Sequence, residues 1–258
     1  MSAPRPDGPA KRERADVLLV DRGLAPTRQK AQALILAGEV FSGEARIDKP
    51  GVALRTDSEL RVSPRRRFVS RGGEKLDGAL EDLASASQLR ALDGRVAVDV
   101  GASTGGFTDC LLQRGAARVY AVDVGTNQLD ARLRADPRVV VRDQTNARDL
   151  EASAFDERID LVVVDASFIG LGLLMPAIAR VLPAGDLLAL VKPQFEAGKA
   201  EVSKGKGVIR DEATRERAID GARDAVREAG FEILSEADSR LRGPKGNLER
   251  FLHAVRKR

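Results

Sequence analysis

A run of alternating valines followed by three glycines, between residues 96 and 107, limits the folds that this chain can adopt. Val96, Val98 and Val100 are β-branched, which is typical of a strand buried on both faces. Gly101, together with glycines at 105 and 106, allows the backbone to turn sharply and to approach a ligand closely. The residues that follow have a helical pattern, and their first N–H groups would face the loop. The stretch predicts a strand, a ligand-binding loop and a helix of an open α/β sheet.

A second apolar strand, at 118–124, carries an acid, Asp123, near its end. An acid at the end of the second strand commonly binds a ribose diol, so we expect a site for a cofactor that contains adenosine. The glycine spacing is Gly-x-x-x-Gly-Gly and lacks the Gly-x-Gly of dinucleotide sites. It resembles the first motif of S-adenosylmethionine-dependent methyltransferases. The alternative interpretation is a tight turn that binds nothing.

Apolar strands and amphipathic helices alternate through the rest of the chain. We expect strands at 96–101, 118–124, 138–142, 160–165, 186–192, 231–236 and 251–256, with helices that include 106–114, 170–182 and 211–229. Such alternation predicts an α/β fold with a doubly wound, mostly parallel sheet. The methyltransferase resemblance implies a Rossmann-like sheet of seven strands that ends in a hairpin.

The first part of the chain has another pattern and an excess of basic residues, whereas the rest is close to neutral. Two short helices precede a hairpin around Ser42-Gly43 and a strand at 59–62. A basic appendage indicates nucleic-acid binding, and a solubilising charged surface is the alternative. We expect a disordered tail at 1–12, a small α+β domain at 13–63, a basic linker at 64–70 and the large domain at 71–258.

The small domain resembles the S4 RNA-binding domain. The resemblance is carried by Arg14-x-Asp16, Gly23, Thr27-Arg28-x-x-Ala31, Leu34-Ile35, Gly38-x-Val40 and Gly43, while Ala15 and Ser42 depart from the usual pattern. It implies that basic side chains meet RNA phosphates, which position the RNA without specifying its sequence. The residues implicated are Arg14, Arg22, Arg28, Lys30 and Arg46, with Arg65, Arg66 and Arg67 of the linker.

Charged residues end two apolar strands of the large domain. Asp165 follows one strand and Lys192 follows the next. Ligands bind at the carboxyl ends of strands in open α/β sheets, so we expect both side chains beside the cofactor. A lysine of lowered pKa can take the proton of a hydroxyl group. Lys192 is therefore the candidate base, with Lys75 as a second cation and Asp165 as an orienting group.

Four motifs together resemble the TlyA family, which joins an S4 domain to an FtsJ-like ribose 2′-O-methyltransferase. They are Val69-Ser-Arg-Gly-Gly-x-Lys75, Asp99-Val-Gly-Ala-Ser-Thr-Gly-Gly-Phe-Thr-Asp109, Val191-Lys-Pro-Gln-Phe-Glu196 and Gly243-Pro-Lys-Gly-Asn247. The resemblance implies S-adenosylmethionine as cofactor and ribosomal RNA or ribosomal subunits as partner, with methylation of a cytidine ribose.

The same resemblance implies which residues act. The catalytic tetrad would be Lys75, Asp165, Lys192 and Glu249, and Glu196 and Glu232 remain alternatives to Glu249. The cofactor contacts would come from Asp99, Gly101, Ser103, Gly105, Gly106, Asp123 and Asp143.

Composition weighs against other classes of protein. One cysteine and one histidine argue against a protein-built metal site and a disulfide framework, so we expect no metal and a cytoplasmic location. No apolar run approaches the ~18 residues that span a membrane, although some family members are called haemolysins. Aromatic residues make up 3%, which gives no evident platform for base stacking. The competing functions are a non-catalytic RNA- or ribosome-binding factor and a membrane-acting haemolysin, and the oligomeric state stays open.

Overall fold

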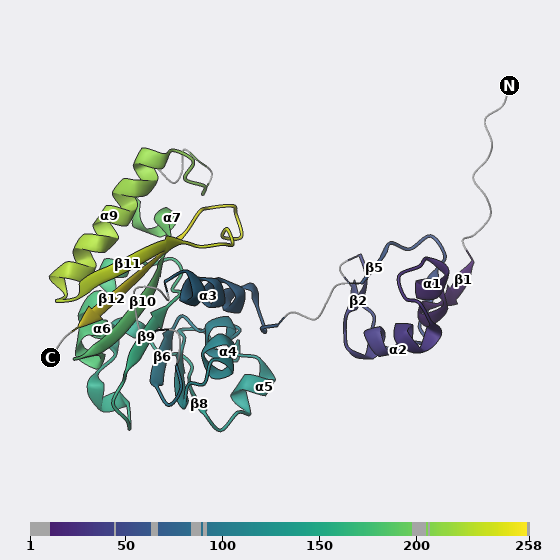
Figure 1. The fold of residues 1–258 in the computed structure, drawn as a ribbon, viewed down its shortest axis with the longest axis horizontal. Helices are drawn as coiled ribbons and strands as arrows, with labels where there is room; N and C mark the ends of the chain where they lie inside the picture. The colour runs from purple at the N-terminus through teal and green to yellow at the C-terminus, as the bar shows by residue number, and fades with distance from the viewer. Residues whose placement is uncertain are drawn as a thin grey trace. The chain divides into compact units, whose positions relative to one another are not determined.

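The computed structural model describes residues 11–43, 45–62, 67–83, 89, 92–197, 205 and 207–256. The chain divides into two compact units, Met1–Arg66 and Arg67–Arg258, within the linker expected at 64–70. Figure 1 shows the elements of each unit. Arg65 and Arg66, two of the expected RNA-binding residues, lie outside the described residues, as do residues 1–10 of the expected tail.

The N-terminal unit packs two short helices against two small antiparallel sheets, ordered β1-β4 and β3-β2-β5. Thr27 caps α2, as its sequence position predicts, because its side chain accepts a hydrogen bond from the Lys30 backbone N–H. Leu19, Ala31 and Ile35 form the centre of the core. The elements are β1 (Arg12–Arg14), α1 (Ala15–Asp21), α2 (Arg28–Leu36), β2 (Val40–Ser42), β3 (Ala45–Arg46), β4 (Ala53–Arg55) and β5 (Leu60–Val62).

The boundary of the expected tail needs a small correction. Arg12 lies opposite Arg55 in the pairing of β1 with β4, so regular structure begins at Arg12 and not after it. A strand of three polar residues has no apolar alternation from which it could be predicted, because backbone pairing alone defines it.

The C-terminal unit contains a seven-stranded sheet in the order β11-β12-β10-β9-β6-β7-β8. The five strands from β10 to β8 are parallel, and β12 lies antiparallel between β10 and β11. This confirms the expected α/β fold, with strand ends shifted by one or two residues. The strands are β6 (Val96–Val100), β7 (Arg118–Val122), β8 (Val139–Arg142), β9 (Leu161–Val164), β10 (Gly185–Val191), β11 (Glu232–Asp238) and β12 (Arg250–Arg256).

Helices cover both faces of this sheet (Figure 1). Helices α3, α4 and α5 pack on one face and α6 and α9 on the other. Strand β6 serves both layers, since Val98 and Val100 face the α6 and α9 side whereas Ala97 faces the α3 side. The helices are α3 (Arg71–Asp82), α4 (Gly106–Gln113), α5 (Ala131–Arg134), α6 (Met175–Val181), α7 (Pro193–Glu196) and α9 (Glu212–Glu228), with short 3₁₀ turns η2 (Ala147–Asp149), η3 (Ala152–Ala154) and η4 (Leu171–Leu173).

The topology fixes where a ligand can bind. The chain order runs from β6 through β7 to β8 in one direction and through β9 to β10 in the other. The carboxyl ends of β6 and β9 therefore flank the point at which the order reverses, which is where open α/β sheets hold their ligands.

Candidate active site

The glycine loop between β6 and α4 is shaped by the protein that surrounds it. Gly101 and Gly105 have φ angles of +84° and +93°, a region that glycine adopts without strain. A Cβ at Gly101 would lie 2.9 Å from the Asp165 carbonyl oxygen, and one at Gly106 would lie 2.2 Å from the Ser70 Oγ. We expected these glycines to leave room for a ligand. In the structure, neighbouring segments of the protein fill the space that a side chain would need.

A cavity of about 720 Å³ opens at the carboxyl ends of β6, β7 and β9, within the size range of cofactor sites. Its walls combine apolar side chains with a few polar groups, a mixture that suits an adenosine-containing molecule. Four of the expected site residues line it: Gly101, Ser103, Asp123 and Asp165. The other lining residues are Val100, Val122, Val124, Gln128, Thr145, Asn146, Ala147, Arg148, Ala166, Ser167, Phe168, Ile169, Gly170, Leu173 and Leu174.

Backbone donors hold the carboxylate of Asp123 at the wall of this cavity. The Ser103 N–H donates to Oδ2 at 2.8 Å, and the Gly125 N–H donates to Oδ1 at 2.7 Å. Each carboxylate oxygen has further lone pairs, so the fixed group can still accept from the hydroxyls of a ribose. The placement agrees with the role expected for an acid at the end of the second strand.

The other expected cofactor residues, Asp99, Gly105, Gly106 and Asp143, are not among those that line the cavity. Asp99 is fully buried and accepts a hydrogen bond from the Thr108 hydroxyl at 2.7 Å. Burial raises the pKa of Asp99 to about 7. Gly105 and Gly106 form the entry to α4. Asp143 accepts from the Asn127 N–H at 3.1 Å and from Arg134 at 2.9 Å. The geometry supports a role for these residues in holding the loops around the cavity.

Lys192 and Asp165 form an ion pair at the edge of the cavity. Their Nζ and Oδ1 atoms lie 2.6 Å apart, and Nζ also donates to the Asp165 carbonyl at 3.1 Å and to the Ser167 Oγ at 2.9 Å. The Lys192 side chain is only 9% exposed. Three oxygens thus fix the position of one ammonium group beside the ligand site.

Lys75 and Glu249 form a second and more deeply buried pair. Lys75 Nζ lies 2.5 Å from Glu249 Oε2, and the two side chains are 8% and 1% exposed. The acid that pairs with Lys75 in the structure is Glu249, and its membership of the catalytic tetrad stays a prediction. Glu196 instead accepts from the Leu171 N–H, with its pKa raised by burial, and Glu232 is exposed on β11.

Strand pairing brings these two ion pairs together. Val191, the last residue of β10, lies opposite Arg250, the first residue of β12, in an antiparallel pairing. Lys192 directly follows β10 and Glu249 directly precedes β12, so the two residues lie at adjoining strand ends. The Gln194 amide also reaches Glu249 Oε1 at 3.5 Å. The structure therefore gathers Lys75, Asp165, Lys192 and Glu249 at one edge of the sheet.

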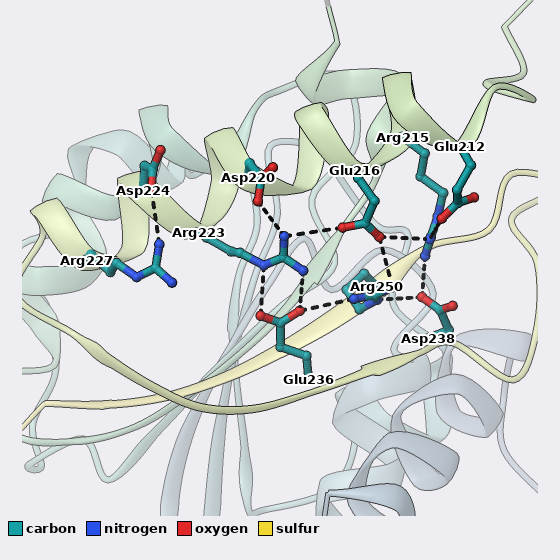
Figure 2. Close-up of polar contacts among 10 residues, drawn as sticks. All are labelled: Glu212, Arg215, Glu216, Asp220, Arg223, Asp224, Arg227, Glu236, Asp238 and Arg250. Carbon is teal, nitrogen blue, oxygen red and sulfur yellow. Dashed lines mark hydrogen bonds and ion pairs between the residues drawn. The ribbon is translucent and has the colours of Figure 1, made fainter.

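Charged side chains between α9 and the β11–β12 pair hold the segment that carries Glu249 (Figure 2). On one side of Glu249, the Leu248 carbonyl accepts from Arg215 Nε at 3.2 Å. On the other side, Arg250 pairs with Glu236 at 3.1 Å and with Glu216 at 3.2 Å. Both neighbours of Glu249 are thereby fixed to elements outside the edge that holds the two ion pairs.

Two phenylalanines beside this edge were missed by the sequence analysis. Phe168 lines the cavity, is 91% exposed and has a φ of +66°, which is strained for a residue with a bulky side chain. Its ring lies 5.1 Å from that of Phe195, and Lys192 Nζ lies 6.0 Å from the Phe195 ring centre. Aromatic residues are scarce in the whole chain, but one of them is nevertheless exposed at the site. The sequence did offer one signal for Phe168, because it closely follows Asp165, the acid at the end of a strand.

The expected RNA-binding residues of the N-terminal unit are exposed, and most of them are held by oxygen acceptors. Arg14 and Arg28 both bind Asp16. Arg22 donates to the backbone carbonyls of residues 56 and 58, and Arg46 pairs with Asp48. Lys30 is exposed on α2. In the C-terminal unit, Arg67 pairs with Asp77.

The chain matches two family models, FtsJ-like methyltransferase over residues 68–257 and S4 domain over residues 13–60. It is 46% identical over 246 residues to the 16S/23S rRNA (cytidine-2′-O)-methyltransferase TlyA of Mycobacterium tuberculosis, covering 94% of this chain and 90% of that protein. It is 38% identical to Hemolysin A of Brachyspira hyodysenteriae, covering 94% of this chain and 99% of the relative.

Solved structures of other proteins share the fold of this chain. A Streptococcus thermophilus protein with a provisional hemolysin assignment is 39% identical, with a TM-score of 0.70 and coverage of 95% of this chain and 89% of that chain. Magnesium protoporphyrin IX methyltransferase of Synechocystis PCC 6803 shares the fold at 15% identity, with a TM-score of 0.51, over 76% of this chain and 89% of its own.

Among the described residues, no helix has the length and apolar character needed to cross a membrane. The matched models and relatives together extend over nearly the whole chain. The chain therefore belongs to the FtsJ-like methyltransferase family, in the TlyA group, and it carries an N-terminal S4 domain.

Proposed function

We propose that this protein transfers a methyl group from S-adenosylmethionine to the 2′-hydroxyl of a cytidine ribose in ribosomal RNA. One observation carries the proposal furthest. Asp165 lines the cavity and also binds Lys192 at 2.6 Å, so the candidate base lies at the border of the candidate cofactor site. The rRNA methyltransferases among the relatives support the choice of substrate.

The cavity residues fit S-adenosylmethionine. The carboxylate of Asp123 is held so that it can accept from the ribose hydroxyls, and Val122, Val124 and Leu174 offer apolar surface for the adenine. The Asp165 carboxylate suits the positively charged end of the molecule. The cofactor supplies an electrophilic methyl group to this site.

Positioning and proton transfer then fall to the protein. In its neutral form the Lys192 amine accepts the proton of the 2′-hydroxyl, and Asp165 and Ser167 keep that amine in place. The buried Lys75 cation, held by Glu249, stabilises negative charge that develops on the 2′-oxygen. Alignment of the acceptor oxygen supplies a large part of the rate enhancement.

Exposed groups would hold the RNA. The Phe168 ring at the edge of the cavity can stack on the base of the target nucleotide. Arg14, Arg22, Arg28, Lys30, Arg46 and Arg67 would bind phosphates, and Arg65 and Arg66 stay predictions from the sequence. Acting on ribosomal RNA, the protein would work in the cytoplasm.

The test is incubation with labelled S-adenosylmethionine and unmodified ribosomal subunits, followed by mapping of the labelled nucleotide. We expect label on a ribose 2′-oxygen and a rate roughly 10²- to 10⁴-fold lower for Lys192→Ala, the range for loss of a general base. Cofactor affinity, measured by calorimetry, should change little.

Lys192→Arg is the matched variant, because it keeps the positive charge but cannot become neutral at ordinary pH. If it retains full activity, Lys192 acts as a cation and not as a base. If the wild type binds the cofactor and the subunits yet transfers no methyl group, the protein is a binding factor and the proposed reaction is wrong.

A further inference from the structure

The N-terminal unit buries one carboxylate completely. Asp16, in the first turn of α1, has no exposed surface. The Arg14 guanidinium beside it, with help from Gln32 and Arg28, holds the pKa of the Asp16 carboxyl well below its usual range. Asp16 therefore stays ionised, and its burial requires that its charge be matched by neighbours.

Three side chains from two parts of the fold donate to Asp16. Arg14 binds both carboxylate oxygens, through Nε at 2.9 Å and Nη2 at 3.0 Å. Arg28 and Gln32, at the start and the middle of α2, donate to Oδ2 at 3.0 and 2.8 Å. One buried acid thus joins the residue that precedes α1 to the exposed face of α2.

The two arginines remain open to solvent on their other sides. Their side chains are 45% and 57% exposed, whereas Asp16 is fully covered. The hydrogen bond from Arg28 to Asp16 uses Nε, so the terminal nitrogens of its guanidinium remain as donors for another ligand. The group of Arg14, Asp16 and Arg28 carries one net positive charge, presented by two ordered guanidiniums. This pattern suits a phosphate, which guanidinium groups bind with paired N–H donors.

We propose that Asp16 is a positioning residue for RNA binding, which fixes Arg14 and Arg28 as a preformed site for a backbone phosphate. The proposal rests on the proposed function, because it takes ribosomal RNA as the ligand. The proposal assigns a role in RNA binding to an acidic residue, whose own negative charge repels RNA phosphates. An arginine that is already ordered loses less side-chain freedom when it binds, so its contact contributes more to affinity.

The unit contains a matched pair with which this can be tested. Arg55 also binds an aspartate two residues later, through two hydrogen bonds to Asp57, but that pair is exposed on both sides. Asp16→Asn and Asp57→Asn each make the protein more positive by the same amount. If charge alone governs RNA binding, both changes strengthen it or leave it the same. If Asp16 positions the arginines, only Asp16→Asn weakens it.

We would measure binding of the full-length variants to unmodified ribosomal RNA over a series of salt concentrations. For Asp16→Asn we expect a Kd that is roughly 5- to 10-fold higher than that of the wild type. The Kd should also depend less steeply on salt concentration, as it does when an arginine contact is lost. Asp57→Asn should bind at least as tightly as the wild type. Circular dichroism and cofactor binding report whether each variant is folded.

Arg28→Lys keeps the test decisive if Asp16→Asn fails to fold. It retains the charge on the exposed side of the cluster but lacks the Nε donor, so we expect a similar loss of affinity. Where Asp16→Asn does fold, the double variant should lose less affinity than the sum of the two single losses, because Asp16 acts in part through Arg28. Binding by Arg28→Lys that equals the wild type, or by folded Asp16→Asn that equals or exceeds it, overturns the inference.

The outcomes separate this inference from the proposed function. A folded Asp16→Asn protein that binds RNA normally, in a preparation whose wild type methylates ribosomal RNA, removes only the role of Asp16. A wild type that binds no ribosomal RNA overturns both.

Discussion

Lys75 and Glu249 lie 174 positions apart in the chain, yet their charged groups meet at 2.5 Å in a part of the protein that water barely reaches. One residue comes from α3 and the other directly precedes β12. The pair therefore links the start of the C-terminal unit to its last strand at the candidate catalytic edge.

Replacing Glu249 with Gln should leave the Lys75 ammonium buried without a counter-charge. Breaking a buried pair in this way costs about 3–5 kcal/mol of unfolding free energy. We expect a clear fall in the urea midpoint together with loss of methyl transfer. Asp82→Asn, which breaks an exposed pair with Arg240, is the control and should leave the midpoint unchanged. Equal midpoints for the two variants would contradict this account.

Gly106→Ala should destabilise the C-terminal unit strongly, because the new Cβ would lie 2.2 Å from Ser70 Oγ and 2.8 Å from the Gly73 nitrogen. Gly221 in α9 is exposed and has open space around its Cβ position. Gly221→Ala should therefore stabilise the protein by about 0.5–1 kcal/mol, the usual gain in a helix. Thermal unfolding should show a lower unfolding temperature for Gly106→Ala and a higher one for Gly221→Ala than for the wild type.

The order of strands and helices could be predicted from the sequence, because the apolar runs of the large domain are long and end in glycine or charged residues. The reason for the glycines could not. Gly101 and Gly106 are required by the close approach of segments 165–166 and 70–73, and such approaches depend on the tertiary fold. Short polar strands such as β1 carry no periodicity, so they too were missed.

The candidate site could be predicted only in part, because some of its contacts follow from strand topology and others from strand register. Asp165 and Lys192 end parallel strands, and topology alone brings such residues to one edge. The pairing of Lys75 with Glu249 depends on the register of β12 against β10, to which no sequence pattern pointed; only the family resemblance suggested it. The positive φ of Phe168 is likewise a property of the folded backbone.

Asp123→Asn should weaken binding of S-adenosylmethionine roughly 10- to 100-fold, the usual effect of losing hydrogen bonds to a charged group. Asp143→Asn distinguishes the expected cofactor contact from the geometry seen here, in which Asp143 binds Asn127 and Arg134. We expect little change for Asp143→Asn in calorimetry. A large loss would instead restore Asp143 as a direct cofactor contact.

Asp99 should make stability depend on pH. Burial raises its pKa from the ordinary aspartate value of 3.8 to about 7, so the folded protein holds a proton that the unfolded chain releases. Its contribution to stability is complete below pH 3.8 and is lost as pH rises towards 7. Asp99→Asn should remove this dependence, and denaturant titrations between about pH 4.5 and pH 8 would detect the change. An unchanged slope would show that Asp99 ionises normally in the fold.

Phe168→Gly should relieve backbone strain of about 1 kcal/mol while it impairs methylation of RNA. The measured result would be a slightly higher unfolding temperature and a raised KM for ribosomal subunits, with a smaller change in affinity for the cofactor, whose cavity Phe168 also lines. Phe168→Leu keeps the strained backbone without the aromatic ring and serves as the control. If Leu restores full activity, stacking on a base is not what the ring provides.

The place of β12 between β10 and β11 has a consequence for biosynthesis. Among the strands of the described residues, β12 comes last in chain order, yet it lies in the interior of the sheet, and Glu249 just before it completes the candidate catalytic edge. A growing polypeptide on the ribosome can thus form the parallel strands and their cavity early, yet it stays without its second ion pair until segment 249–256 has emerged. The charge arrangement of the candidate site is therefore complete only after all the parallel strands of the sheet have been made.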